Sequence, residues 1–165
     1  MTVRSERPAD AEAVWALTAA AFGRPDEADL VDRLRETHGY LALVVEDAGV
    51  VVGHIAFSPV ALDPPASVDV RGLAPMAVAP DRQRGGIGSA LVHAGLDACR
   101  SDGAEAVVVL GHPAYYPRFG FAPGPPRGIA CEYDVPDEAF MVLDLVPDAL
   151  AEIEAVVRYG PVFGG

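Results

Sequence analysis

The sequence contains no lysine and no asparagine, and it has only two cysteines. The absence of lysine excludes a Walker-type phosphate loop, a pyridoxal Schiff base and a lysine nucleophile. The absence of asparagine excludes an N-glycosylation acceptor. Cys99 and Cys131 are isolated in the chain, so we expect neither a disulfide framework nor a metal site.

Positive charge and long hydrophobic runs are also scarce. Twelve arginines face 24 acidic residues, which gives a formal charge of −12, whereas a general nucleic-acid binder needs a basic surface. No apolar run approaches the roughly 20 residues of a membrane helix. Residues 1–7 lack the apolar core of a signal peptide. We therefore expect a cytoplasmic protein without membrane or nucleic-acid partners.

The length and hydrophobic content predict one folded domain over residues 1–165. Hydrophobic periodicity places helices and strands in a mixed α/β (α+β) order. Helices are expected at residues 11–22, 27–37, 87–99 and 147–157, with one Pro-interrupted helical turn at 112–119. Strands are expected at residues 2–4, 41–46, 50–59, 68–79, 106–110 and 140–146.

Local signals sharpen four of these elements. Asp10 is a good N-cap for the first helix. Residues 47–49 predict a hairpin turn. Pro75 inside its strand indicates a bulge or a sheet edge. The continuous apolar run at 106–110 indicates burial on both faces.

The most informative segment is the Gly-rich turn that joins residue 78 to the helix at 87. A helix that begins there leaves backbone N–H groups unpaired at the positive end of its dipole, and glycines let a large anion approach them. Residues 82–96 contain no carboxylate, and Ser89 adds a hydroxyl donor. The turn therefore predicts a phosphate or pyrophosphate site, with a plain strand-to-helix connection as the alternative.

A Rossmann dinucleotide site is disfavoured. Gly86 and Gly88 supply two of the required glycines, but Leu91 occupies the third position. The long approach from residue 80 to 84 is also unlike the tight Rossmann turn.

Two motifs carry a resemblance to a known family. Gln83-Arg84-Gly85-Gly86-Ile87-Gly88 resembles the Q/R-x-x-G-x-G/A signature of the GNAT superfamily of acyl-CoA N-acyltransferases. Tyr116-Pro117-Arg118-Phe119-Gly120-Phe121 is similar to the Y-x-k-x-G-F element of these enzymes. The resemblance covers nearly the whole chain. It implies a GNAT fold, with a mixed central sheet of about six or seven strands flanked by helices and splayed at the acyl-CoA site.

The resemblance also implies a cofactor site for acetyl-CoA. The pyrophosphate would be held by the backbone amides of Gln83, Arg84, Gly85, Gly86, Ile87 and Gly88, with Ser89 beside them. The pantetheine arm would pair with Met76, Ala77 and Val78 as an added strand does. The Val78 N–H would polarise the thioester carbonyl, which is an oxyanion-hole role.

Tyr116 matches the family's usual general acid and would also contact the cofactor; an aromatic packing role is the alternative. Tyr115 is expected to pack, and Arg118 to meet a phosphate or form a surface ion pair. The general base stays open among His112, His54, Asp26, Glu27 and a water chain. Neither cysteine has a histidine partner by sequence, so a thiol nucleophile is not expected.

The function implied is transfer of an acetyl group from acetyl-CoA to a primary amine of a small molecule or a protein. A non-catalytic acyl-CoA-binding or sensing module is the alternative. Residues 132–154 carry eight carboxylates and no arginine, which suits a cationic amine or a solvated surface. The apolar segment 159–163 is expected to pack on its own domain or on a second copy in a homodimer.

Overall fold

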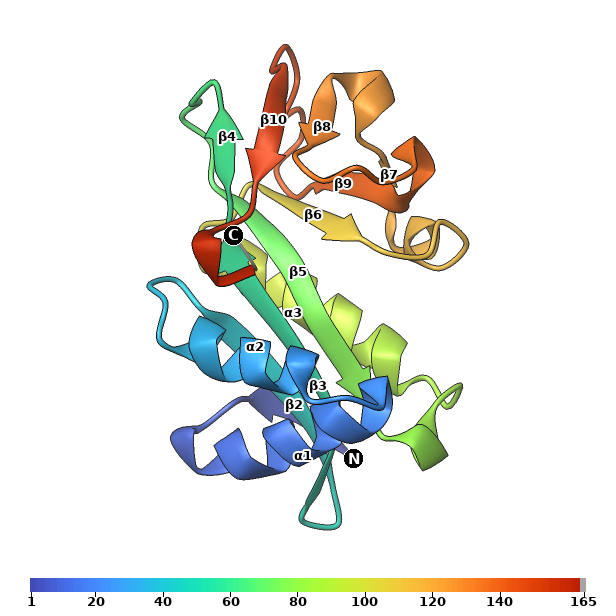
Figure 1. Cartoon of the computed structure of the whole chain (residues 1–165). Helices are drawn as coiled ribbons and strands as arrows, with labels where there is room; N and C mark the ends of the chain where they lie inside the picture. Colours follow the sequence, from blue (N-terminus) through green and yellow to red (C-terminus); the bar gives the residue numbers. More distant parts are fainter. Residues whose placement is uncertain (164–165) are drawn as a thin grey trace. The chain divides into compact units, whose positions relative to one another are not determined.

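The computed structural model describes residues 1–163, and the chain forms two compact units (Figure 1). The first unit contains Met1–Ser58 and Ala74–Ala98, and the second contains Pro59–Leu73 and the chain from Cys99 onward. Three elements, two strands and a helix, have residues in both units. The expectation of a single domain over residues 1–165 stays a prediction, and residues 164 and 165 lie outside the described residues.

The described residues form three α-helices and ten strands. The helices are α1 (Ala11–Phe22), α2 (Asp26–Arg35) and α3 (Ile87–Ser101). The strands are β1 (Thr2–Ser5), β2 (Leu41–Asp47), β3 (Val50–Pro59), β4 (Ala61–Asp63), β5 (Val70–Val78), β6 (Ala106–Leu110), β7 (Ala122–Pro123), β8 (Ile129–Cys131), β9 (Phe140–Asp144) and β10 (Ala155–Arg158).

The strands form one large mixed sheet and one small sheet. The large sheet has seven strands in the order β1-β2-β3-β5-β6-β9-β7, and the small one has three in the order β4-β10-β8. The β5–β6 pair is parallel, whereas β1–β2, β2–β3 and β6–β9 are antiparallel. This confirms the predicted α+β class and mixed sheet; the small sheet was not predicted.

The hairpin of the first unit follows from its turn residues. Strands β2 and β3 pair from Leu41↔Phe57 to Asp47↔Val50, which leaves Ala48 and Gly49 as the turn. Both have left-handed backbone, with φ of 51° and 80°. Two such residues make the type I′ turn whose twist matches paired strands, so the predicted hairpin is confirmed.

The helices of the first unit cover opposite faces of its strands (Figure 1). Val14 of α1 and Val31 of α2 pack with Val44 of β2 in one buried cluster. On the other face, α3 approaches β3 closely, because a Cβ on Gly95 would lie 2.5 Å from the Phe57 ring. A Cβ on Gly53 would lie 2.8 Å from Cγ2 of Ile87. These two glycines therefore set the distance between α3 and the sheet.

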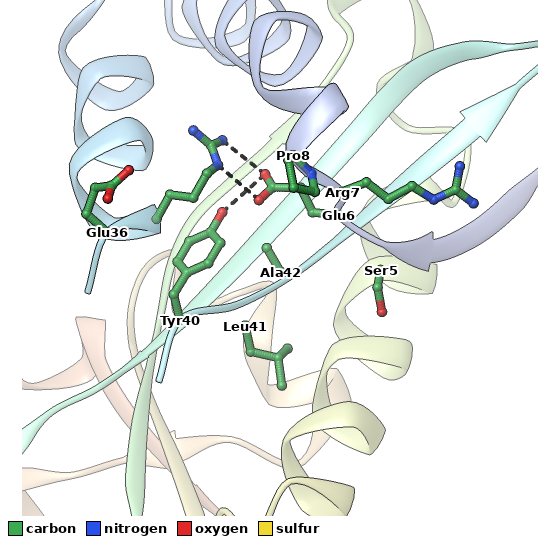
Figure 2. A pocket seen from close by; sticks show the side chains of 9 residues that line it. Ser5, Glu6, Arg7, Pro8, Glu36, Tyr40, Leu41 and Ala42 are labelled. Carbon is green, nitrogen blue, oxygen red and sulfur yellow. Dashed lines mark hydrogen bonds and ion pairs between the residues drawn. The ribbon is translucent and has the colours of Figure 1, made fainter. Parts of the chain in front are cut away.

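A buried carboxylate joins three elements of the first unit (Figure 2). Glu6, just after β1, accepts hydrogen bonds from Arg35 at 3.2 and 3.1 Å and from the Tyr40 hydroxyl at 3.2 Å. Burial alone would raise the pKa of Glu6, but hydrogen bonds from His54 and Arg35 outweigh it and lower the pKa to about 2. Glu6 is thus an ionised anchor beside a pocket of about 550 Å³.

Asp10 does not act as predicted. It precedes α1, but its side chain makes no cap hydrogen bond to that helix. The carboxylate instead accepts the Arg7 N–H at 2.7 Å and pairs with the Arg4 guanidinium at 2.8 and 2.9 Å. A short 3-10 turn before α1 aims Asp10 back at β1, and a charge-assisted pair with arginine outcompetes the helix amides.

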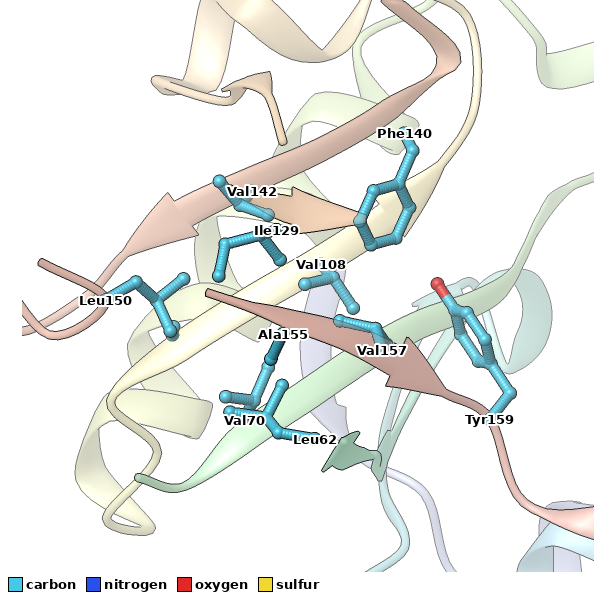
Figure 3. Packing of buried hydrophobic residues seen from close by; sticks show 11 residues of the cluster. Leu62, Val70, Val108, Ile129, Phe140, Val142, Leu150, Ala155, Val157 and Tyr159 are labelled. Carbon is cyan, nitrogen blue, oxygen red and sulfur yellow. The ribbon is translucent and has the colours of Figure 1, made fainter. Parts of the chain in front are cut away.

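The second unit has its own apolar core (Figure 3). Strands β6 and β9 pair from Ala106↔Asp144 to Leu110↔Phe140, and residues 106–109 of β6 are buried, as the apolar run predicts. Val108, Phe140 and Val157 belong to one cluster with Ile129. Tyr159 also joins it, and Phe163 packs against it, so the C-terminal segment packs on its own unit.

The predicted helix at residues 147–157 is wrong. Asp148 and Glu152 have left-handed φ of 60° and 64°, which interrupts any helix between them. Residues 155–158 form β10, which pairs with β4 on one side and β8 on the other. Residues 155–158 thus form a strand because they pair with two neighbouring strands and bury alternate side chains, and these interactions outweigh the local helix propensity.

Of the two alternatives predicted for Pro75, a bulge or a sheet edge, the sheet edge is wrong, because β5 is an interior strand of the seven-stranded order. The register of β5 with β6 runs from Val70↔Ala106 to Leu73↔Val109. Pro75 comes after its last pair, where a missing N–H removes no bond from that register.

We expect Gly95→Ala to lower the free energy of unfolding by about 1–3 kcal/mol, because the new methyl overpacks the buried Phe57 ring. Urea unfolding measures the change. Gly160→Ala is the control: its Cβ would meet no atom within 4 Å, so it should change stability by less than about 0.5 kcal/mol. Equal stability of the two variants would contradict the packing argument.

The pairing of Asp10 predicts acid sensitivity. The hydrogen bond from Arg4 lowers the pKa of Asp10 from 3.8 to about 2. A depressed folded-state pKa stabilises the protein above pH 3.8, and this contribution is lost as the pH falls toward 2. Asp10→Asn should therefore lower the free energy of unfolding at pH 6 and have nearly the same stability as the parent near pH 2. Glu12→Gln, which changes an exposed carboxylate, should leave the stability unchanged at both pH values. A destabilisation independent of pH would refute this.

Candidate active site

The turn between β5 and α3 has the geometry of an anion cradle. Arg84 and Gly86 both have left-handed backbone, with φ of 66° and 89°. Helix α3 begins at Ile87, and the Ala90 N–H donates to the Gly86 carbonyl at 3.0 Å. The N–H groups of the turn before Ala90 therefore have no acceptor inside the helix. The first turn of α3 contains no acidic residue, so its dipole is free to attract an anion.

Side chains tie this turn to the strands of the first unit. Gln83 Nε2 donates to the Val78 carbonyl at 3.2 Å, and Arg82 pairs with Asp47 of the hairpin at 2.7 Å. The hydrogen bond from Arg82 lowers the pKa of Asp47. The Ala79 N–H donates to the Val52 carbonyl at 2.9 Å. These bonds fix the strand side of the turn.

All predicted cofactor-binding positions except Tyr116 belong to the first unit. Met76 and Val78 are half-buried at the end of β5, and Ala77 is buried between them. Residues 83–86 are exposed, whereas the Ile87 side chain is buried in the core. The turn at residues 83–86 is therefore open to solvent, whereas the buried Ile87 side chain anchors the start of the helix.

Tyr116 belongs to the second unit and is 8% exposed. Its ring meets those of Tyr115 and Phe121 edge to face, with centroids 5.1 and 5.7 Å apart. A Cβ on Gly111 would lie 2.4 Å from the Tyr116 ring, so glycine is required there. Burial raises the pKa of Tyr116 to about 12, which keeps the phenol protonated at neutral pH.

The neighbours of Tyr116 have packing roles. The Tyr115 ring contacts Phe119 and carries the Arg118 guanidinium 4.5 Å above it. Arg118 Nε also donates to the Tyr115 carbonyl at 2.9 Å. The expected packing of Tyr115 is confirmed, and Arg118 makes a cation–π contact on its own turn.

The candidate bases differ sharply in their surroundings. His54 is fully buried in β3, with Nε2 3.0 Å from Oε1 of Glu6. Glu27 is paired with Arg24, whose hydrogen bond lowers the pKa of Glu27 and makes it a poor base. His112 is exposed, and its carbonyl accepts the Tyr115 N–H at 3.0 Å. Asp26 is exposed at the start of α2.

Glu6 is the partner of His54 that sequence analysis missed. It lies 48 positions before His54, and no periodic pattern links them. The only local hint is an acidic residue directly after a short strand. The pairing needs the β1–β2 and β2–β3 registers, which bring the two chain segments together.

The two cysteines and the acidic segment at residues 132–154 are poor candidates for catalytic groups. Burial raises the pKa of the Cys99 thiol to about 12 and also raises the pKa of Cys131, so neither is a ready nucleophile. In the acidic segment, Glu132 accepts the Tyr159 N–H and Asp144 pairs with Arg127, so part of that charge serves the fold. Within residues 1–163, no group of three or more His, Cys, Asp or Glu side chains could hold a metal ion. No helix in that range is long and apolar enough to cross a membrane.

Comparison with known families decides the relationship. The sequence profile of the Acetyltransferase (GNAT) family matches residues 11–121. The chain belongs to the GNAT family of acetyltransferases. It is 38% identical over 164 residues to the uncharacterized N-acetyltransferase YhbS of Escherichia coli K12, and this alignment covers 96% of each chain. The resemblance predicted from the two motifs is therefore confirmed.

Solved GNAT structures share the fold closely. YhbS from Escherichia coli, in complex with CoA, superposes with a TM-score of 0.93 at 37% identity, covering 99% of this chain and 92% of that one. A GNAT family acetyltransferase from Brucella melitensis, in complex with acetyl-CoA, superposes with a TM-score of 0.82 at 36% identity. The match covers 98% of this chain and 97% of that one. The GNAT membership makes this chain an acetyl-CoA-dependent N-acetyltransferase and decides against a protein that only binds acyl-CoA.

We expect Gly86→Ala to weaken coenzyme A binding at least tenfold. The substitution strains a left-handed position and puts a methyl on the exposed face of the cradle. Isothermal titration with coenzyme A measures the effect. Gly23→Ala is the matched control, since Gly23 also has positive φ with open space around it but ends α1. Equal affinities in both variants would show that the turn does not hold the ligand.

Proposed function

We propose that this GNAT enzyme transfers the acetyl group of acetyl-CoA directly to a primary amine of a small molecule or a protein. The observation that carries the proposal is the turn at residues 83–88, which opens into an acid-free helix N-terminus. Such a terminus suits a pyrophosphate. The related structures that contain CoA and acetyl-CoA support the same ligand.

The proposed cofactor residues divide into three groups. The backbone amides of residues 83–88, with Ser89, hold the pyrophosphate. Residues 76–78 of β5 pair with the pantetheine arm by main-chain hydrogen bonds. The Val78 N–H polarises the thioester carbonyl. A backbone donor is suited to this role because it needs no reorganisation during the reaction.

We propose Tyr116 as the proton donor to the departing sulfur. The phenol stays protonated at neutral pH because burial raises its pKa to about 12. Because it is protonated, the phenol can donate a hydrogen bond to the sulfur and supply a proton as negative charge develops there. The acceptor itself, and assembly with a second copy, stay predictions.

Tyr116→Phe should lower kcat at least about 10²-fold while it leaves the affinity for acetyl-CoA nearly unchanged. Thiol release from acetyl-CoA in a screen of primary amines measures turnover, and a thermal melt with acetyl-CoA measures binding. Tyr115→Phe is the matched control, since it removes the adjacent hydroxyl and keeps the ring. Equal turnover in the two variants would remove Tyr116 from the chemistry.

A further inference from the structure

One face of β3 carries two buried polar side chains with unsatisfied atoms. His54, Ala56 and Ser58 are alternate residues of the strand, so they point to the same side of the sheet. His54 is 0% exposed and Ser58 is 3% exposed. Within residues 1–163, neither His54 Nδ1 nor Ser58 Oγ has a hydrogen-bond partner. Only the small side chain of Ala56 separates them.

Such atoms are costly to bury, and native proteins usually pair them with protein groups or ordered water. The other two buried unsatisfied atoms, Arg4 Nε and Asp144 Oδ1, belong to side chains in ion pairs. The pair on β3 is different because both atoms lie on one face of one strand. The row from His54 to Ser58 therefore suits a short chain of water molecules.

Glu6 determines which ring nitrogen of His54 carries the proton. Its ionised carboxylate only accepts hydrogen bonds, so His54 Nε2, at 3.0 Å from Oε1, must donate. Two bonds from Arg35 and one from Tyr40 hold that carboxylate in place. In the neutral imidazole the lone pair is then on Nδ1, the unsatisfied atom of the row.

The row lies beside the strand proposed to bind the thioester. Strand β3 is the neighbour of β5 in the sheet, and the Val52 carbonyl, two residues before His54, accepts the Ala79 N–H. The charged and titratable groups that face His54 are Glu6 after β1, Tyr40 before β2 and, through Glu6, Arg35 of α2. Val44 of β2 pairs directly with His54 and adds no charge.

Acetyl transfer to an ammonium ion requires such an acceptor. The nitrogen loses two protons as the C–N bond forms and the C–S bond breaks. Tyr116 gives its proton to the departing sulfur, one of the two nitrogen protons restores the phenol, and a base must take the other. An imidazole oriented by a carboxylate suits this task, because the carboxylate stabilises the imidazolium that forms.

We propose that His54 Nδ1 accepts this proton through a water chain along the His54–Ser58 row, with Glu6 as the positioning residue. The proposal rests on the proposed amine acetylation. Since His54 is fully buried, water carries the proton to it, and Ser58 Oγ orients that water. After the product leaves, the imidazolium returns its proton to solvent by the same route.

Two measurements test the row without any turnover. A high-resolution crystal structure should show ordered water within hydrogen-bond distance of His54 Nδ1 and of Ser58 Oγ. The ¹⁵N chemical shifts of labelled histidine should show His54 protonated on Nε2, and Glu6→Gln should change that state. A dry row, or a proton on Nδ1 at neutral pH, would overturn the proposal even if the enzyme acetylates amines.

Kinetics test the role of the row, with thiol release from acetyl-CoA and propylamine as the probe. His54→Gln should lower kcat/KM about 10²-fold and abolish the acidic limb of its pH profile. Ser58→Ala should lower kcat/KM about tenfold without lowering the melting temperature, because the hydroxyl it removes makes no hydrogen bond to the protein. Thr18→Val is the control, since Thr18 is an equally buried hydroxyl in the same unit that bonds only to the Val14 carbonyl of its own helix.

The outcomes separate the two proposals. Variants of His54 and Ser58 that keep the parent pH profile would show that the row only supports the fold. If the parent protein releases no thiol with any amine, the proposed function fails, and the crystallographic and NMR results still decide whether the water row exists.

Discussion

The close approach of α3 to β3 is the constraint on which the cofactor cradle depends. A Cβ on Gly53 would lie 2.8 Å from Ile87, the first residue of the helix, so this contact lies at the turn that we propose holds the pyrophosphate. The attraction of a helix terminus for an anion falls off within one turn. The position of the first turn of α3 therefore decides whether the helix dipole can attract a phosphate. Gly53 of β3 determines that position, because it lets Ile87 approach the strand.

Strand β3 serves two purposes because its faces differ. Gly53 and Phe57 face α3, and they make the close packing that places the cradle. The opposite face carries the His54–Ser58 row and the link to Glu6. Since strand residues alternate between faces, one short segment supports both the cofactor site and a buried polar network.

Elements with one strong local pattern were predicted well. The apolar run at 106–110 became β6, and the hairpin turn formed at Ala48-Gly49, where both residues accept left-handed backbone. The errors arose where distant partners outweighed local preference. Residues 155–158 form a strand because β4 and β8 flank them, and Asp10 turns to Arg4 instead of capping α1. Strands β4 and β8 are distant from β10 in the sequence, and Arg4, six residues before Asp10, reaches it only through the 3-10 turn between them.

The sequence by itself predicted the candidate cofactor cradle and the candidate acid. Gly85, Gly86 and Gly88 between a strand and a helix imply exposed amides, whatever the rest of the chain does. Only the tertiary structure decided the environment of His54, because Glu6 and Tyr40 contact it from separate segments of the chain and Arg35 of α2 holds Glu6 in place. Helix dipoles and turns depend on neighbouring residues, whereas a buried hydrogen-bond network depends on strand register, and register forms only when the whole sheet folds.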